Sequence, residues 1–132
     1  MTAYHGSCHC GRVKYRVVLD LARGTFKCNC SMCTKTRAWL AIVPPGDFTL
    51  LAGAFDLADY EFGAHRIHHT FCKHCGVRPF ARATNASGEP GVAIRLHCLD
   101  DLDPAVLAAA PVAYFDGRND DFGQAPAVTA HL

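Results

Sequence analysis

Eight cysteines in a chain of 132 residues constrain the fold of this protein more than any other feature of its sequence. Seven of them lie in three short clusters and one stands alone. The clusters are Cys8-x-Cys10, Cys28-x-Cys30-x-x-Cys33 and Cys72-x-x-Cys75, and the single residue is Cys98. Two thiols one residue apart in a strand, or two residues apart in a tight turn, can present both sulfurs to one metal ion. The spacing therefore predicts thiolate metal sites, with zinc as the metal.

The rest of the composition narrows the compartment and the partners. The N-terminal residues lack the charged and apolar regions of a secretory signal, and no segment approaches the roughly 20 apolar residues that span a bilayer. We therefore expect a cytoplasmic protein with no membrane partner, where clustered thiols bind metal or react rather than form disulfides. A net charge of +1, with 13 basic residues spread along the chain, argues against a nucleic-acid partner.

Length and apolar patterning predict one mainly β domain over residues 1–132. Apolar and basic residues alternate from Val13 to Val17, which is typical of a half-buried strand. Short apolar runs bounded by glycine and proline predict further strands near 38–43, 48–51, 60–62, 66–71 and 92–96. Asp103 as N-cap and Pro104 at the first helical position predict one short C-terminal helix. The expected fold is thus an assembly of antiparallel strands with that single helix.

The spacing alone does not decide which clusters share a metal. The pair Cys72 and Cys75 forms a four-thiolate site equally well with Cys30 and Cys33, as in a zinc ribbon, or with the first pair of the chain. Only the second combination leaves the three thiols of the middle cluster together. In either case, the glycine that follows each outer pair is expected to supply the positive φ that such turns require.

Three segments together carry a resemblance to a known family. They are residues 6–15 (GSCHCGRVKY), 28–33 (CNCSMC) and 71–76 (FCKHCG). In this order the chain resembles the glutathione-dependent formaldehyde-activating enzymes, whose domain is called GFA, from residue 6 to about residue 115. The resemblance implies an Mss4-like β-tent with two zinc ions per chain. It also implies that a structural zinc is held by Cys8, Cys10, Cys72 and Cys75, and a second zinc by Cys28, Cys30 and Cys33.

A zinc with three protein thiolates has one open position, which is the mark of a catalytic rather than a structural site. The resemblance implies a carbon–sulfur lyase that joins formaldehyde and glutathione into S-(hydroxymethyl)glutathione, with a small thiol as substrate. Two alternatives stay open at this point. Cys98 or a histidine could close the second site and leave a zinc-stabilised binding module. Alternatively, Cys98 could be a redox nucleophile, as in methionine-R-sulfoxide reductases, although Asp100 stands where their motif has asparagine.

Several other residues have two interpretations. Lys27, Lys35 and Arg37 flank the middle cluster and are expected on a solvated face, where they could also neutralise thiolates or substrate carboxylates. Trp39 is expected in the core rather than in a pocket wall. Of His68 and His69, strand alternation allows only one to face inward. The oligomeric state does not follow from the sequence.

Overall fold

The computed structural model describes all 132 residues and is mainly β, as the sequence predicts. The strands are β1 (Thr2–Ser7), β2 (Lys14–Leu19), β3 (Thr25–Cys28), β4 (Leu40–Val43), β5 (Phe48–Ala52), β6 (Leu57–Tyr60), β7 (Ile67–Cys72), β8 (Phe80–Thr84), β9 (Pro90–Arg95) and β10 (Val112–Phe115). The helices are α1 (Ser31–Thr36) and α2 (Pro104–Ala109). Neither helix is long and apolar enough to cross a membrane.

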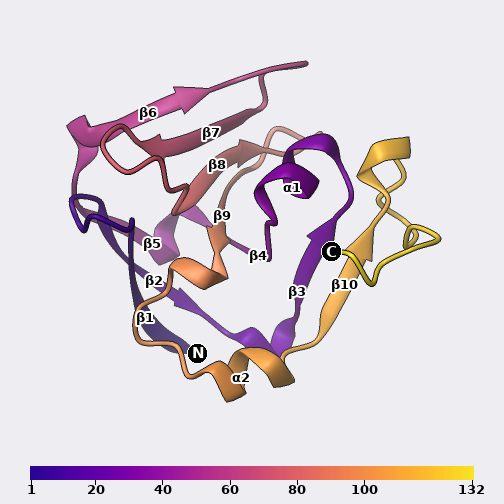
Figure 1. Ribbon diagram of the computed structural model, residues 1–132, viewed down its shortest axis with the longest axis horizontal. Coiled ribbons are helices and arrows are strands. Elements are labelled where there is room, and N and C mark those ends of the chain that lie inside the picture. Colours follow the sequence, from indigo (N-terminus) through magenta and orange to yellow (C-terminus); the bar gives the residue numbers. More distant parts are fainter.

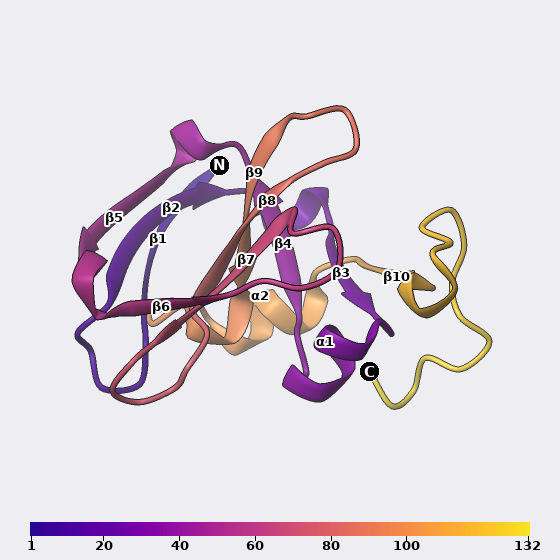
Figure 2. The same ribbon diagram turned by 90° about the horizontal axis from the view of Figure 1, so that it is seen from above.

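The strands form two sheets. One has three strands in the order β1-β2-β5, and the other has seven in the order β10-β3-β4-β9-β8-β7-β6. All neighbouring strands are antiparallel except β3 and β10, which run parallel. Seen from above, the small sheet lies on one side of β9, β8 and β4, and the C-terminal segment extends on the opposite side (Figures 1 and 2). Helix α1 lies near β3 and the C-terminal end.

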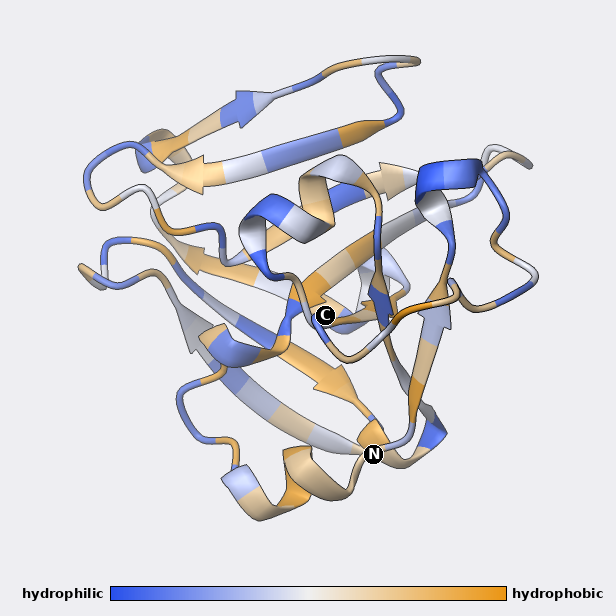
Figure 3. Ribbon diagram, turned by 45° about the vertical axis from the view of Figure 1, so that its right-hand side comes forward, coloured by the Kyte–Doolittle hydropathy of each residue, from blue (hydrophilic) through white to orange (hydrophobic).

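The core lies between the two sheets. Tyr15 and Val17 of β2 are fully buried, whereas Lys14 and Arg16, which alternate with them, are exposed. The changes of hydropathy along the strands can be followed in Figure 3. The ring of Phe48 in β5 lies 5.2 Å from the ring of Tyr15 and 4.7 Å from that of Phe80 in the large sheet. Burial of each such side chain stabilises the folded state by about 1.5–3 kcal/mol. The contact between Phe48 and Phe80 therefore helps to hold the two sheets together.

Most of the predicted elements are present. The apolar runs at 38–43, 48–51, 66–71 and 92–96 correspond to β4, β5, β7 and β9, and the predicted helix is α2. Asp103 Oδ1 accepts a hydrogen bond from Ala105 N at 2.8 Å, as its N-cap role requires. The strand expected at 60–62 lies instead at Leu57–Tyr60, because the chain turns away after Tyr60.

Beside the predicted C-terminal helix the structure has a second short helix, α1, which spans the end of the middle cysteine cluster. Its N-cap is Cys30, whose Sγ accepts a hydrogen bond from Cys33 N at 3.3 Å. Sequence rules for helix starts look for serine, threonine, aspartate or asparagine at this position. These rules therefore do not predict a helix whose N-cap is a cysteine.

Candidate metal centres

The first and third cysteine clusters lie on matching turns. Cys8 and Cys10 follow β1, and Cys72 ends β7 with Cys75 three residues later. In each turn the glycine after the second cysteine donates its N–H to the carbonyl of the first, at 3.2 Å for the earlier turn and 2.9 Å for the later one. These glycines, Gly11 and Gly76, have φ of 82° and 76°, so the predicted positive φ is confirmed.

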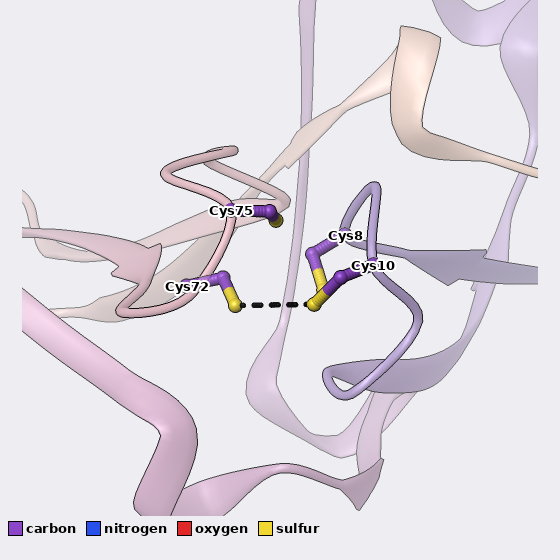
Figure 4. Close-up of side chains that lie close together, drawn as sticks. All are labelled: Cys8, Cys10, Cys72 and Cys75. Carbon is purple, nitrogen blue, oxygen red and sulfur yellow. Dashed lines mark hydrogen bonds between the residues drawn. The ribbon is translucent and has the colours of Figure 1, made fainter.

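The two turns bring their four sulfurs together, and the zinc-ribbon pairing of Cys72 and Cys75 with the middle cluster does not occur. All four sulfurs lie within 4.8 Å of one another. Figure 4 shows them converging from the two loops, with Cys8 Sγ 3.6 Å from Cys10 Sγ and Cys10 Sγ 3.7 Å from Cys72 Sγ. A zinc tetrahedron with bonds of about 2.3 Å has sulfur–sulfur edges of about 3.8 Å. A disulfide requires about 2.05 Å, so the cluster fits a zinc ion and not a disulfide.

Backbone donors around this cluster favour thiolates. Val13 N donates to Cys8 Sγ at 3.3 Å, and His74 N donates to Cys72 Sγ at 3.4 Å. Backbone N–H groups of Cys10 and Val77 lower the pKa of Cys75 to about 6. Burial acts in the opposite sense on Cys8, raising its pKa to about 11. A divalent cation offsets that desolvation, because metal binding favours deprotonated thiols even when they are buried.

The middle cluster is built on the junction of a strand and a helix. Cys28 ends β3, Cys30 caps α1 and Cys33 lies in its first turn. The three sulfurs lie within 4.8 Å of one another, and Cys30 N donates to Cys28 Sγ at 3.4 Å. Hydrogen bonds with Cys28 and Cys33 lower the pKa of Cys30, whereas hydrogen bonds with Cys28 and Cys30 raise that of Cys33. Three thiols this close together form a donor set that suits zinc once they are deprotonated.

No other histidine, cysteine, aspartate or glutamate has a ligand atom within 4.8 Å of all three sulfurs. Cys98, the alternative fourth ligand, lies outside both clusters, and its Sγ–H donates to Arg78 O at 3.7 Å. Burial raises the pKa of Cys98 to about 11, so the thiol stays protonated and is a poor nucleophile. The position of Cys98 therefore does not favour its role as a fourth zinc ligand. Its raised pKa does not favour its role as a redox nucleophile, as in the methionine-R-sulfoxide reductases.

A C-terminal loop packs against the middle cluster, and the sequence analysis did not identify it. Asn29 Nδ2 donates to Asp116 Oδ1 at 2.8 Å, and Asn29 Oδ1 accepts from Arg118 N at 2.9 Å. Between these two, Gly117 lies so close to Cys28 that a Cβ on the glycine would overlap the Cys28 sulfur. The only local signal was the turn-forming composition of the segment, which says nothing about its neighbours.

The flanking charged and aromatic residues have separate roles. Lys35 and Arg37 are exposed, whereas Lys27 is half-buried with its Nζ 4.5 Å from the centre of the Trp39 ring. Trp39 packs against the core, as expected, but it also lines a cavity, so its assignment to the core alone was incomplete. His69 is buried and His68 is exposed, as strand alternation predicts.

The fold and its two thiol clusters define a class of small, mainly β proteins suited to zinc. The family model described as glutathione-dependent formaldehyde-activating enzyme matches residues 3–115, so the chain belongs to this family. A crystal structure of a Rhodobacter sphaeroides protein, a structural genomics target, is similar to this chain. It superimposes with a TM-score of 0.70 at 28% sequence identity, covering 83% of this chain and 99% of the other.

Proposed function

We propose that this protein is a zinc-dependent carbon–sulfur lyase that acts on the thiol adduct of formaldehyde or of another small aldehyde. Cys28, Cys30 and Cys33 hold the catalytic zinc, and the four-thiolate cluster holds a structural one. The observation that carries the proposal is the middle cluster, in which three thiols converge and no fourth protein ligand is within reach. Membership of the formaldehyde-activating family supports the reaction class.

The reaction is balanced without a further reactant. In the synthetic direction a thiol sulfur forms a bond to the carbonyl carbon, the C=O π pair moves to oxygen, and oxygen takes up the proton that the thiol lost. Lyase activity is the reverse. A zinc ion bound at the three thiolates supplies the positive charge that lowers the pKa of a substrate thiol.

The residues of the chain contribute position and electrostatics. Helix α1 holds Cys33 beside Cys30, and Gly117 covers Cys28 on one side. The cluster therefore sits on elements that fix the sulfurs before a substrate arrives, which reduces the entropic cost of the reactive geometry.

Exchange NMR at equilibrium tests the proposal, because formaldehyde and glutathione also combine spontaneously. The zinc-loaded protein at micromolar concentration is expected to accelerate exchange between ¹³C-formaldehyde and S-(hydroxymethyl)glutathione, and Cys30→Ser is expected to abolish that acceleration. Zinc content should fall from two ions per chain to one in this variant. The matched control is Ser31→Ala, which changes an exposed neighbour and should keep both zinc and activity. If Cys30→Ser accelerated the exchange as much as the wild type does, the proposal would be ruled out.

A further inference from the structure

The last residues of the chain fold back towards the middle cluster. After the loop that carries Gly117, the chain runs outward and then returns, so that its end lies beside β3 and α1 in both views (Figures 1 and 2). A turn forms this end, in which Leu132 N donates to Thr129 O at 3.0 Å. We call residues 129–132 the strap. The strap lies beyond residues 3–115, which the family model matches, so family membership assigns it no role.

Two cations next to the cluster hold the strap. Lys27 Nζ donates to Leu132 O at 3.0 Å, and Arg37 Nη1 donates to His131 O at 3.2 Å. Lys27 precedes the first thiol of the cluster, and Arg37 ends the helix that carries the last one. Hydrogen bonds from charged donors are stronger than neutral ones, so they anchor a short segment. The hydrogen bond of Arg37 is exposed to water, so the strap can detach while the sheets stay folded.

The strap leaves little space at the sulfurs. The gap beside Cys28 and Cys33 has a volume of about 10 Å³, about enough for one water molecule. A thiol adduct is larger than one water molecule, so it does not reach these two sulfurs through the gap while the strap is in place. The other lining residues of the gap are Thr34, Arg37, Ala38, His131 and Leu132.

Arg37 forms the partition between this gap and a larger cavity. The cavity has a volume of about 320 Å³, within the range of small-molecule sites, about 300–1,000 Å³. Arg37 lines it together with Arg78 and Arg95, among others, whereas no cysteine of the middle cluster does. Arg37 is also the one residue that lines both the cavity and the gap. A movement of its side chain would therefore join the two spaces.

We propose that the strap and Arg37 form a gate at the middle site. In the structure the gate is closed, because the hydrogen bond to His131 O holds the Arg37 side chain between the gap and the cavity. Release of the strap frees this side chain and opens a path from the cavity to Cys28 and Cys33. The inference rests on the proposed function for the identity of the substrate that enters, but the same gate also controls how fast the metal exchanges.

Zinc release tests the gate without turnover, because a chelator must reach the metal as a substrate does. The zinc-loaded protein is mixed with an excess of the chromophoric chelator pyridylazoresorcinol. Deletion of residues 130–132 removes both acceptors of the strap and should speed the release of the middle zinc about tenfold, the usual effect of losing a charge-assisted hydrogen bond. Lys35→Met, which removes an exposed cation of α1, is the matched control and should not change the rate.

The zinc of the four-thiolate cluster serves as an internal control. Its release should not change in the deletion variant, because neither hydrogen bond of the strap reaches its two turns. Cys30→Ser, which is expected to hold this ion alone, identifies its phase.

Arg37→Ala distinguishes a gate from two separate obstacles. If the strap acts by holding Arg37, removal of either one opens the same path, so the double variant should also release zinc about tenfold faster than the wild type. An increase of about a hundredfold in the double variant would mean that the two act independently and would overturn the inference. So would an unchanged rate in the deletion variant. A deletion variant that binds only one zinc would overturn it too, because the strap would then belong to the metal site.

Exchange NMR separates a failure of the gate from a failure of the lyase proposal. Faster zinc release from the deletion variant, without acceleration of formaldehyde exchange by the wild type, supports the gate and contradicts only the lyase. Acceleration by the wild type, with equal release rates in all variants, contradicts only the gate.

Discussion

At the scale of single residues, the middle cluster depends on a glycine far from it in the sequence. Gly117 is not needed for an unusual φ, since its backbone is outside the positive region. It is needed because its Cα packs on Cys28 and leaves no room for a side chain. Interiors of this density tolerate an added methyl group only if their neighbours move.

The first prediction follows from this contact. Gly117→Ala is expected to destabilise the fold by about 1–3 kcal/mol, the usual cost of overpacking, and to weaken zinc binding at the middle cluster. Chemical denaturation and zinc content per chain measure the two effects. Gly123→Ala is the matched control, because its Cβ would meet only Asp121 Oδ1 at 3.4 Å. Equal stability and zinc content in both variants would contradict the prediction.

At the scale of elements, the edge hairpin of β6 and β7 carries an ion pair that the sequence did not indicate. His68 Nδ1 lies 2.5 Å from Asp59 Oδ2 and 3.3 Å from Glu61 Oε1. The hydrogen bond to the Asp59 carboxylate raises the pKa of His68. A histidine whose pKa is higher in the folded state stabilises that state when it is protonated.

The second prediction is the pH dependence of this hairpin. The stabilisation by His68 should be fully present below its unfolded pKa of about 6.5 and should disappear as the pH rises through the folded value. His68→Gln should therefore lower Tm at pH 5.5 and leave it closer to wild type at pH 8.5. Thermal melts of both proteins at the two values measure this, and a Tm gap that is larger at pH 8.5 would contradict it.

At the scale of the whole molecule, the four-thiolate cluster connects the two sheets. Cys8 and Cys10 follow the first strand of the small sheet, and Cys72 ends a strand of the large one. Structural zinc in small domains supplies about 10–16 kcal/mol, as much as the net stability of a typical domain, about 5–15 kcal/mol. The middle cluster does not connect the two sheets, because its cysteines lie at the end of β3 and the start of α1.

The third prediction contrasts the two clusters. Cys72→Ser, or removal of zinc by a chelator, is expected to abolish cooperative unfolding, whereas Cys30→Ser should keep a cooperative transition. Near-UV circular dichroism and thermal melts distinguish the two states. A wild-type Tm in Cys72→Ser would show that the cluster does not stabilise the fold.

The sequence predicted much of the fold where local backbone geometry controls it. The alternation in β2, the turn glycines Gly11 and Gly76, and the cap of α2 by Asp103 are all set within a few residues, and the structure confirms them. The strands β1, β3, β8 and β10 were not predicted. Their apolar patterns are too short to indicate a strand by themselves. These segments are strands because they pair with and pack against neighbouring strands. The single domain, the cytoplasmic location and the role of each site residue stay predictions.

The sequence by itself determined the chemistry available, which is two pairs of thiols and one group of three, because the spacing of ligands on a turn or strand is a local property. The tertiary structure decided how those groups combine. It joined the outer pairs, kept Cys98 apart, placed Gly117 on Cys28, and gathered Arg37, Arg78 and Arg95 around one cavity. These contacts link residues far apart in the chain, and the order of strands in the two sheets brings them together. That order depends on how the whole core packs, which no local pattern records.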